Sequence, residues 1–502
     1  MEFLEDRKHA PRKLGRVLVL GLGKSGHDVA EYCLRLLGTR VEGLYIAAGQ
    51  PNDRAQRLAD RARAEGARAI FGEGAVRELA ALAHGRFDVC VASPGIPPRD
   101  ELYQDALAVS DEVISEVEFA WRESARGSRW VAVTGTNGKT TVTSLIDHIL
   151  RGAGMASRAV GNIGDTCTSA VEEGGFDVYV AETSSFQLAS IADFAPDVSV
   201  LLNITPDHLY WHGSLEAYRD AKLRILENLP QMPGAVAVLD ATNDIVREQV
   251  RRLRAQDEAS RGFAYVPVGT AGGLSGDMRA ACGSDNAAFV GSDGTLLVAF
   301  GGHLHSLGNR ADLLIKGEHN VGNALVAAAA AIAMGASDES VKRGLATFKP
   351  LEHRIEPCGS IQGAACYNDS KATNVDATLK AFAAFPEARP IVLLGGKDKG
   401  TDLAPLVAAA HRHSRAVVCF GAARERFAAA FTDAAGAEPA DFSLLEADHL
   451  ADALDEAVAI AHAGDVILLS PACASFDEFS CFEERGDVFK KLVADRAASL
   501  GA

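Results

Sequence analysis

Short apolar runs alternate with helical stretches rich in Ala and Leu along almost the whole chain. The runs with the length and β-branched content of buried strands are residues 17–20, 89–92, 131–134, 178–181, 198–203, 391–394, 416–420 and 466–470. This alternation is typical of α/β proteins whose sheets are mostly parallel. Since the chain has 502 residues and one domain usually takes roughly 150, we expect about three domains.

Two breaks in the alternation predict where the domains end. The polar segment 122–129 precedes a new strand, and residues 350–353 follow an Ala-rich helix and a polar turn. We therefore predict an N-terminal domain over residues 1–126, a central domain over 127–350 and a C-terminal domain over 351–502. Residues 262–309 are rich in Gly and Ser with short alternating strands, which predicts a small β-rich insertion beside the central sheet.

Charge and composition exclude several classes of protein. Fifty Lys and Arg against 67 Asp and Glu give a net charge of −17, so nucleic acids and anionic membranes are poor partners. No secretory signal is visible, and the longest apolar run, residues 324–334, is too short to span a bilayer. The nine Cys form no CxxC pair, which is typical of reduced, buried thiols. We expect a monomeric cytoplasmic protein without nucleic-acid or membrane partners.

The strongest motif is VAVTGTNGKTTV at residues 131–142, an apolar strand that runs into a glycine-rich turn and then a helix. Gly135 and Gly138 allow backbone N–H groups to turn toward phosphate oxygens. Lys139 adds a cation for the terminal phosphates, and the Thr140 hydroxyl suits Mg²⁺. The loop is shorter than the standard GxxxxGK[ST], which would need a glycine two residues before Gly135. An ordinary glycine-rich turn is the alternative, but the strand–turn–helix context favours a nucleoside triphosphate site.

Further polar residues follow the next predicted strands. Glu182 ends one of them, where a carboxylate in the same sheet as a phosphate loop can bind Mg²⁺. The segment NITPDH places His208 after another strand, and Lys222 lies in the next helix. A lone His or Lys at such a position is usually structural or solvated. Only the occurrence of His208 and Lys222 together with the other motifs indicates a functional site. Asn320 and Asn323 begin a later helix on one face, where they read a base edge or cap the helix.

The first predicted strand leads into a second glycine-rich loop, GLGKSG, at residues 21–26. On its own this GxGxxG pattern suggests an NAD-linked oxidoreductase, which needs an acid at the end of the second strand to bind the ribose hydroxyls. That acid is missing, because Glu42 lies at the beginning of the second strand. We therefore expect the loop to receive another diphosphate, with Ser93 of SPGI on the opposite lip of the cleft.

Four polar clusters in the last third of the chain lie at or just after predicted strands. They are His353-Arg354, NDSKATN at 368–374, GGKDK at 395–399 and SPACASFD at 470–477. Any one of them alone is consistent with a surface loop. Together they indicate a ligand site, because α/β sheets bind ligands at the carboxyl ends of their strands.

In order along the chain, TGTNGKTT, GNIG, ETSSFQL, NITPDH, the lysine of AKLRI, GEHNVGNAL, EHR, NDSKATN and SPACASFDEF closely resemble the motifs of the Mur ligases. The motifs SPGI, SSFQL, NDSKATN and SPACAS resemble those of the members that add D-glutamate. The resemblance covers nearly the whole chain. It implies an α/β fold with Rossmann-like N- and C-terminal domains around a central P-loop ATPase-type sheet. It also implies an ATP-dependent, ADP-forming ligase that joins an amino acid to a UDP-linked precursor of peptidoglycan through an acyl phosphate.

The resemblance assigns roles to individual residues. Those implied for catalysis are Lys139, Glu182, His208 and Lys222. Those implied for ATP are Gly135, Thr136, Asn137, Gly138, Lys139, Thr140, Thr141, Asn323, His353, Arg354 and Asp369. Two Mg²⁺ ions would be held by Thr140, Glu182, His208 and a carbamylated Lys222. The UDP-linked substrate would be held by Gly23, Lys24, Ser25, Ser93 and Asn162, and D-glutamate by Lys371, Thr373, Lys399, Ser475 and Phe482.

Three departures from the family pattern are visible. Thr183 stands where Leu is common, Tyr210-Trp211 replaces the usual Asp-Arg, and the second strand lacks the acid often used to bind uracil or its ribose. We interpret the first two as packing changes. A folylpolyglutamate-type ligase would share the phosphate loop but would leave the GLGKSG domain unexplained. A catalytically inactive binding homologue is disfavoured, because all four implied catalytic residues are present.

Overall fold

The computed structural model describes residues 3–277, 279, 284–385, 388–398, 400–434 and 442–500. The chain divides into two compact units. One comprises Met1–Asp312 and Gly322–Thr347, and the other comprises Leu313–Val321 and Phe348–Ala502. The first unit contains the first predicted domain and most of the second, whereas the second unit contains the third predicted domain together with residues 313–321 and 348–350. The boundaries 126/127 and 350/351 stay predictions.

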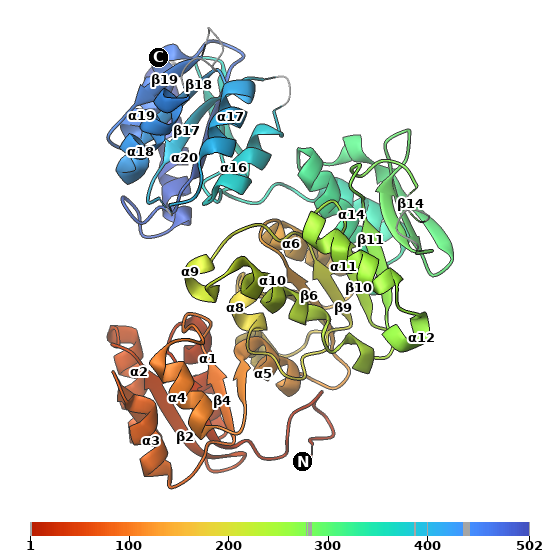
Figure 1. The fold of residues 1–502 in the computed structure, drawn as a ribbon, viewed down its shortest axis with the longest axis vertical. Helices are drawn as coiled ribbons and strands as arrows, with labels where there is room; N and C mark the ends of the chain where they lie inside the picture. Colours follow the sequence, from red (N-terminus) through yellow and green to blue (C-terminus); the bar gives the residue numbers. More distant parts are fainter. Residues whose placement is uncertain are drawn as a thin grey trace. The chain divides into compact units, whose positions relative to one another are not determined.

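The N-terminal part of the first unit is a parallel sheet of five strands in the order β3-β2-β1-β4-β5 (Figure 1). Its strands carry continuous apolar runs because helices cover both faces, and Val17 to Leu20 are fully buried. Its elements are β1 (Gly15–Leu20), α1 (Lys24–Arg35), β2 (Val41–Ala48), α2 (Asp53–Ala64), β3 (Arg68–Phe71), α3 (Ala75–Ala83), β4 (Val89–Ala92), α4 (Glu101–Val109), β5 (Val113–Ser115) and α5 (Glu116–Glu123).

A nine-stranded sheet forms the rest of the first unit, in the order β14-β13-β12-β11-β10-β9-β6-β8-β7. Its strands are β6 (Arg129–Thr134), β7 (Ser157–Gly161), β8 (Val178–Glu182), β9 (Val198–Leu201), β10 (Val236–Asp240), β11 (Ala264–Val268), β12 (Ala287–Val290), β13 (Thr295–Phe300) and β14 (His303–Asn309). Its helices are α6 (Lys139–Gly152), α7 (Cys167–Glu173), α8 (Ser185–Leu188), α9 (Leu209–His212), α10 (Leu215–Leu223), α11 (Asp244–Arg254), α12 (Glu258–Arg261), α14 (Glu318–Ala333, which begins in the second unit) and α15 (Asp338–Thr347).

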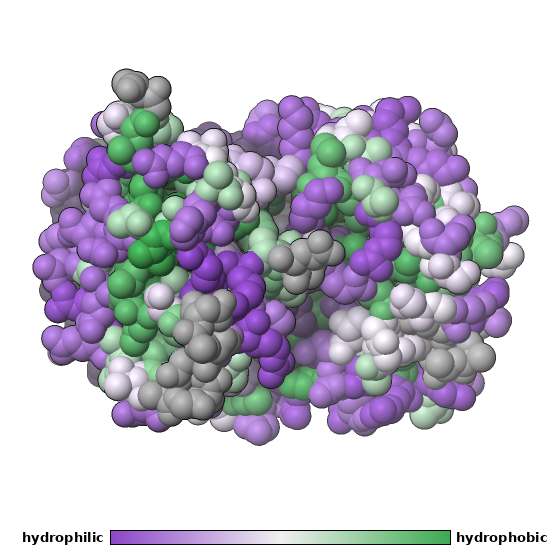
Figure 2. All heavy atoms as spheres, turned by 90° about the horizontal axis from the view of Figure 1, so that it is seen from above, coloured by the Kyte–Doolittle hydropathy of each residue, from purple (hydrophilic) through white to green (hydrophobic). Residues whose placement is uncertain are grey.

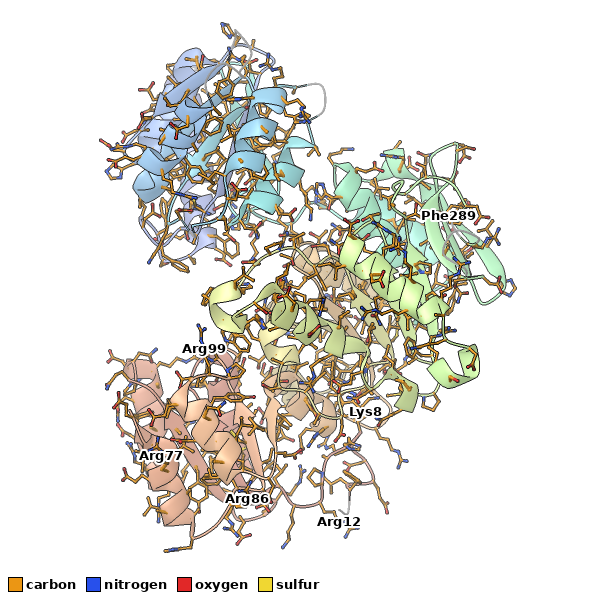
Figure 3. All side chains as sticks on the ribbon, in the orientation of Figure 1. Lys8, Arg12, Arg77, Arg86, Arg99 and Phe289 are labelled. Carbon is orange, nitrogen blue, oxygen red and sulfur yellow. The ribbon has the colours of Figure 1, made fainter. Side chains whose placement is uncertain are left out.

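The predicted β-rich insertion continues the central sheet instead of standing beside it. β11 pairs in parallel with β10 and β12 pairs in parallel with β11, and β13 and β14 then extend the sheet as antiparallel strands. Phe289 of β12, labelled in Figure 3, is buried in the same hydrophobic core as Trp130 of β6. The insertion therefore shares the core of the central domain.

The second unit contains a six-stranded sheet in the order β15-β16-β20-β17-β18-β19, in which β15 is antiparallel to its neighbour and the other strands are parallel. Its elements are β15 (Glu356–Ile361), β16 (Ala364–Asn368), α16 (Val375–Phe382), β17 (Ile391–Gly395), α17 (Ala404–His413), β18 (Ala416–Phe420), α18 (Arg424–Asp433), β19 (Ser443–Glu446), α19 (Leu450–Ile460), β20 (Val466–Ala472) and α20 (Phe482–Leu500). The predicted α/β architecture is thus confirmed.

On the face seen in Figure 2, hydrophilic side chains predominate and hydrophobic ones form separate patches. Among the described residues, no helix combines the length and the apolar character needed to cross a bilayer. All eight described cysteines are free thiols, and six of them are buried.

Candidate functional site

The predicted phosphate loop lies between β6 and α6. Gly135 and Gly138 have φ angles of 156° and 87°, which side chains other than glycine rarely adopt. A Cβ on Gly138 would lie 2.8 Å from Oδ1 of Asn323, so α14 packs against the loop at this residue. The Nζ of Lys139 donates to the carbonyl oxygens of Gly135 and Thr136, each at 2.9 Å. The loop is therefore folded around the lysine that the motif provides for phosphates.

Asn203, which follows β9, fixes the shape of this loop. Its Oδ1 accepts from the backbone N–H of Asn137 at 2.9 Å, and its Nδ2 donates to the Asn137 carbonyl at 3.0 Å. The carbonyl oxygen of Asn203 also accepts from the backbone N–H of Thr136 at 2.6 Å. The sequence analysis assigned Asn203 no role, although it lies in NITPDH. Its position directly after a buried strand of the same sheet was the available signal.

Glu182 lies at the carboxyl end of β8, beside the phosphate-loop strand β6. Its Oε1 accepts from Nδ2 of Asn162 at 2.8 Å, whereas its Oε2 is buried and has no hydrogen-bond partner among the described residues. A buried carboxylate oxygen without a donor is costly, so this atom is suited to a cation. Asn162 therefore contacts the predicted metal ligand, and its predicted contact with the UDP-linked substrate stays a prediction.

The segment after Glu182 is shaped by a capping box, which the sequence analysis did not identify. Ser184 and Gln187 cap α8 reciprocally through their side chains and backbones. Thr183 is fully buried, and its backbone N–H donates to the Val133 carbonyl at 2.8 Å. Its Oγ1 donates to the same carbonyl at 3.1 Å. The departure at Thr183 is therefore accommodated by a hydrogen bond to the phosphate-loop strand. The spacing Ser-x-x-Gln was the signal for the capping box.

Lys222 is the second lysine at the phosphate loop. Its side chain extends from α10 and is only 1% exposed, and its Nζ donates to the Gly135 carbonyl at 2.7 Å. The Nζ also lies 4.8 Å from the ring centroid of Tyr218. Burial, and then the nearby charge of Lys139, hold the pKa of Lys222 well below its usual range. The structure thus brings two lysines to one backbone carbonyl.

His208 occupies a turn just before α9. Its φ of 52° is in the left-handed region, and its Nε2 lies 3.7 Å from Oδ2 of Asp207. Phe186 packs edge-on against the His208 ring at 4.9 Å and stacks on Trp211 at 4.6 Å. Trp211 is buried, whereas Tyr210 is 69% exposed. Trp211 therefore packs on Phe186, which in turn contacts His208. This aromatic packing takes the place of the charged residue usual in the family, in agreement with our interpretation of the departure as a packing change.

His212, at the end of α9, lies in the same aromatic cluster. Its Nε2 lies 2.9 Å from the Ser185 hydroxyl oxygen. Burial, and then the charge of Lys222, lower the pKa of His212 to about 4. Arg99, labelled in Figure 3, follows the SPGI loop and donates to the carbonyl oxygen of Tyr210. The turn that carries His208 is thus linked to the N-terminal sheet.

The GLGKSG loop lies where the strand order of the first sheet reverses, between β1 and β4, which is the usual ligand crevice of such sheets. Ser93 is 7% exposed, and its hydroxyl donates to the Gly21 carbonyl at 3.0 Å. A Cβ on Gly26 would lie 1.8 Å from the same carbonyl oxygen. Lys24, next to Gly23 and Ser25, donates to the Gly164 carbonyl of GNIG. The GLGKSG loop and the SPGI loop, which were predicted to lie on opposite sides of the cleft, are therefore in contact.

Three predicted acceptor residues in the second unit occupy loops at neighbouring strand ends. The Nζ of Lys371 lies 3.6 Å from the ring centroid of Phe482. Ser475, after β20, is 2% exposed. Thr373 donates its backbone N–H to the Lys371 carbonyl at 2.8 Å. Lys399, the remaining predicted acceptor residue, lies outside the described residues.

The nucleotide residues predicted in this unit are also close together. His353 has a φ of 61°, and its Nδ1 lies 2.9 Å from Nδ2 of Asn368. Asp369 follows β16, and its Oδ2 accepts from the Ser470 hydroxyl at 2.8 Å. Burial raises the pKa of Asp369 to about 7, against the lowering effect of the Ser470 hydrogen bond and of the Arg354 charge. Asp369 lies at the carboxyl end of β16, as predicted. His353 does not follow a strand but precedes β15, which is antiparallel to β16, and it therefore lies at the same edge of the sheet.

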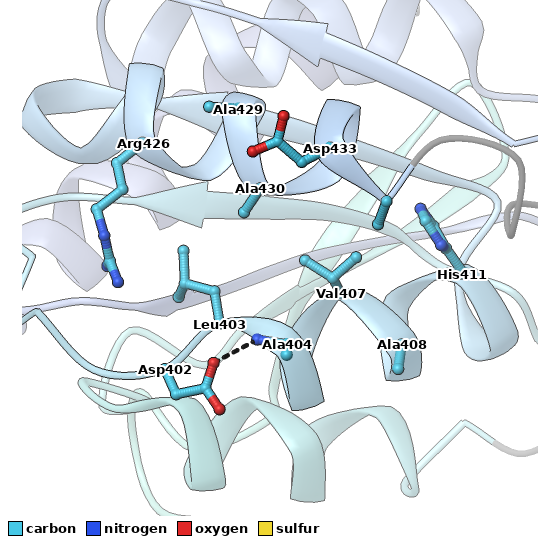
Figure 4. Close-up of a pocket in the computed structure, with 11 residues that line it drawn as sticks. Asp402, Leu403, Ala404, Val407, Ala408, His411, Arg426, Ala429, Ala430 and Asp433 are labelled. Atoms are coloured by element: carbon cyan, nitrogen blue, oxygen red, sulfur yellow. Dashed lines mark hydrogen bonds between the residues drawn. The ribbon is translucent and has the colours of Figure 1, made fainter.

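A separate pocket of about 610 Å³ lies between α17 and α18 (Figure 4). Its walls are mainly Ala, Val and Leu, and Asp402 at its rim accepts from the backbone N–H of Ala404 at 3.0 Å. None of the predicted site residues lines this pocket. It therefore has no part in the site described above.

Family models match both units of the chain. The Mur ligase middle domain matches residues 133–331, and the Mur ligase glutamate ligase domain matches residues 353–473. A UDP-N-acetylmuramoylalanine–D-glutamate ligase of Pelotomaculum thermopropionicum is 36% identical over 95% of this chain and 97% of its own length. The chain belongs to the Mur ligase family. The enzyme of the same name from Koribacter versatilis is 35% identical over 96% of this chain and 98% of its own length.

Solved structures of low identity share the fold of this Mur ligase. A pseudomurein peptide ligase type C from Methanothermus fervidus has a TM-score of 0.54 at 16% identity, covering 96% of this chain and 99% of its own. The MurF ligase from Thermotoga maritima, solved with ADP, has a TM-score of 0.54 at 17% identity, covering 98% of this chain and 97% of its own. A folylpolyglutamate synthase from Mycobacterium tuberculosis, also solved with ADP, reaches 0.54 but covers only 73% of this chain.

Proposed function

We propose that the protein is an ADP-forming ligase that joins D-glutamate to UDP-N-acetylmuramoyl-L-alanine in peptidoglycan precursor synthesis. The carboxylate of the UDP-linked substrate attacks the γ-phosphorus of ATP, and ADP leaves. The amine of D-glutamate then attacks the acyl phosphate, phosphate leaves, and one proton is lost as the amide forms. The relatives that carry this name match the chain from end to end, which favours this substrate pair over that of a folylpolyglutamate ligase.

The observation that carries the proposal is the meeting of Lys139, Lys222 and Glu182 at the phosphate loop. Both lysines donate to the Gly135 carbonyl, and Glu182 ends the neighbouring strand. When ATP enters, Lys139 is positioned to turn from the loop carbonyls to the terminal phosphates. The backbone N–H groups at the start of α6 supply further donors for phosphate oxygens. These groups would stabilise the charge that develops as the phosphoryl group moves.

Magnesium fits the same residues. The buried Oε2 of Glu182 has no donor among the described residues, and Thr140 is the second residue of α6, beside the loop. No cluster of three or more His, Cys, Asp or Glu suited to a metal occurs among the described residues, so ATP oxygens would complete the coordination. Bound Mg²⁺ would neutralise charge on the phosphates. We propose that Thr140, Glu182, His208 and Lys222 together hold two Mg²⁺ ions.

Lys222 is proposed to act as a carbamate. Its neutral amine would add to CO₂ and release one proton, which gives a carboxylate on the lysine side chain. A cation at this place would repel Mg²⁺, whereas carboxylate oxygens are the ligands that Mg²⁺ prefers. Burial and the charge of Lys139 both favour the neutral amine that the addition needs.

The UDP-linked substrate is proposed to bind at the GLGKSG loop, where backbone N–H groups and the start of α1 face the end of the sheet. Asn162, through its contact with Glu182, would then lie between the sugar and the metal ligands. D-glutamate would bind among Lys371, Thr373, Ser475 and Phe482, together with Lys399. We also propose that the enzyme works in the cytoplasm, as a monomer.

Phosphate release from ATP is the direct test. The purified protein should release phosphate only when Mg²⁺, UDP-N-acetylmuramoyl-L-alanine and D-glutamate are all present, and the product should contain both substrates by mass spectrometry. L-glutamate and glycine serve as acceptor controls. Reduction of NAD with a hydroxy acid, or tight NAD binding, would instead support the oxidoreductase that GLGKSG alone suggests.

A further inference from the structure

Arg485 lies in the first turn of α20 and is one of the largest fully buried side chains of the protein, with an exposed fraction of 0%. A buried guanidinium is normally compensated by a carboxylate, because an unpaired charge is expensive to desolvate. Arg485 is a different case. Each hydrogen bond that it makes among the described residues ends on a neutral oxygen.

Those oxygens belong to two different loops. Nε donates to the Ser370 hydroxyl at 2.9 Å and Nη2 donates to the Ser370 carbonyl at 2.8 Å. On the other side, Nη2 donates to the Cys473 carbonyl at 3.1 Å and Nη1 to the Ala474 carbonyl at 3.3 Å. The loop after β16 and the loop after β20 are therefore joined through one planar group. The rigid fork of guanidinium donors suits this task, and a lysine ammonium could not reproduce it.

A third loop joins the same cluster. The backbone N–H of Lys397, after β17, donates to the Ala474 carbonyl at 2.8 Å. A Cβ on Gly396 would lie 2.3 Å from that carbonyl oxygen and 3.0 Å from Nη1 of Arg485. Only glycine permits so close an approach. Arg485 thus lies beneath the ends of three adjacent strands, β16, β20 and β17.

Each of these loops carries a predicted acceptor residue. Lys371 follows Ser370 directly, and Ser475 follows Ala474. The Ser370 hydroxyl accepts from Arg485 and donates to the Phe482 carbonyl at 2.8 Å, so it connects the guanidinium to a further acceptor residue. Ala472, just before the carbonyls that Arg485 holds, has a φ of 57°. A non-glycine residue in that region is strained and persists only where its surroundings hold it.

We propose that Arg485 is a positioning residue for the amino-acid acceptor, which fixes the three loops that bind it and places beneath them a positive charge that no carboxylate among the described residues contacts by a hydrogen bond. The charge would favour a dicarboxylic acceptor in a chain whose net charge is −17. Burial lowers the pKa of Arg485 to about 10, so the group stays charged at neutral pH. The inference rests on the proposed function for the identity of the acceptor, D-glutamate, but not for the existence of the cluster.

Arg485→Ala tests the proposal, with Arg415→Ala as a matched control. Arg415 directly precedes β18 and so lies at the opposite strand ends of the same sheet, where its Nη2 donates to the Ile460 carbonyl at 2.7 Å and to Oδ2 of Asp465 at 2.8 Å. We expect Arg485→Ala to raise the KM for D-glutamate roughly 10- to 100-fold, while the KM values for ATP and the UDP-linked substrate change less than about twofold. Added guanidinium ions at millimolar concentration should recover part of the loss. Arg415→Ala should lower thermal stability without changing the KM for D-glutamate.

Ser370→Ala provides the milder variant if Arg485→Ala fails to fold. It removes the link to the Phe482 carbonyl and should raise the KM for D-glutamate roughly 5- to 10-fold. Hydrogen exchange of the free protein gives a readout that needs no substrate, since the Lys397 amide should exchange faster in Arg485→Ala or Ser370→Ala and not in Arg415→Ala. An unchanged KM and unchanged exchange in the folded variants would overturn the proposal, as would an equal KM increase in Arg415→Ala. If the wild-type protein does not use D-glutamate as an acceptor, the proposed function is wrong. The hydrogen-exchange result for the Lys397 amide would still decide whether Arg485 positions the loops.

Discussion

The two glycine-rich loops of the first unit share one local design and differ in what surrounds them. Each follows a buried parallel strand and opens a helix, β1 to α1 in one case and β6 to α6 in the other. The loop at GLGKSG is backed by a serine hydroxyl, and its one lysine reaches away to the Gly164 carbonyl. The loop at GTNGKT is backed by two lysines and by a carboxylate on the next strand.

This difference separates binding from chemistry. Backbone N–H groups at a helix start suffice to hold a diphosphate, and both loops provide them. Moving a phosphoryl group also requires charges that meet the developing negative charge and the metal. Only the second loop brings such groups together. We therefore expect substitutions at the first loop to affect substrate binding and those at the second loop to affect turnover.

The largest effect is expected from Lys139→Ala compared with Lys24→Ala. Lys139→Ala should lower kcat about 10²- to 10³-fold, because it removes a cation aimed at the transferred phosphoryl group. Lys24→Ala should keep kcat and raise the KM for the UDP-linked substrate by less than about tenfold, since exposed cations contribute little. Steady-state kinetics with each substrate varied would measure both. A loss of kcat in Lys24→Ala as large as that in Lys139→Ala would remove the distinction between the loops.

Lys222→Ala should give the next largest loss, about 10²-fold in kcat, because the carbamate oxygens for Mg²⁺ would be missing. Added formate or acetate should restore part of the activity by supplying carboxylate oxygens. Activity of the wild type should also rise with bicarbonate after the protein has been kept free of CO₂. Lys222→Arg keeps a cation but cannot form the carbamate, so a fully active Lys222→Arg would exclude this role.

The sequence predicted the strands and the glycine-rich loops because their signals are local. The runs at 17–20, 131–134 and 466–470 fall within β1, β6 and β20, since strands buried on both faces read as continuous apolar runs. The resemblance also named loops that the structure places at shared sheet edges, such as those after β16 and β20. The insertion was assigned less well, because nothing in residues 262–309 reveals that their strands pair with the edge of the central sheet.

The residues missed by the sequence analysis act through distant partners. Asn203 binds a loop residue 66 positions away, and Arg485 binds Ser370 at a separation of 115. An arginine next to two glutamates at the start of a helix has the appearance of a solvated residue. Its burial depends on three loops that meet only after folding, and no spacing in the sequence encodes that meeting. Support residues of this kind are therefore visible only in the structure.

A matched glycine pair tests how closely each loop approaches its phosphates. Gly138→Ala places a Cβ at a φ of 87° and 2.8 Å from Oδ1 of Asn323, so we expect about tenfold weaker ATP binding by calorimetry. Gly23 has a φ of −65°, and a Cβ there meets no atom within 4 Å. Gly23→Ala should therefore fold with unchanged thermal stability and raise only the KM for the UDP-linked substrate. If that KM stays the same, the diphosphate binds elsewhere.

The smallest effect on stability is expected where α5 packs on α7, between the two glycine-rich loops. Glu116 begins α5, and its Oε1 accepts from the backbone N–H and the hydroxyl of Thr168, at 2.6 and 2.8 Å. Burial raises the pKa of Glu116 from 4.5 to about 7, and the charge of Asp28 adds to the increase. The folded protein therefore holds this proton more tightly than the unfolded chain does. The contribution of Glu116 to stability is present below pH 4.5 and declines as the pH rises toward 7.

Glu116→Gln isolates this contribution, because the amide oxygen still accepts from Thr168 and no charge forms at high pH. We expect the variant to melt at a higher temperature than the wild type at pH 8, by a few degrees for a gain on the order of 1 kcal/mol. At pH 5 the two melting temperatures should be nearly equal, since the wild-type carboxyl is then protonated as well. Thermal unfolding followed by circular dichroism between pH 5 and 8 would measure the difference. If the difference between the two melting temperatures stays constant from pH 5 to pH 8, Glu116 does not become charged in the folded protein over that range. The contact between α5 and α7 would then contain no titrating carboxyl at Glu116.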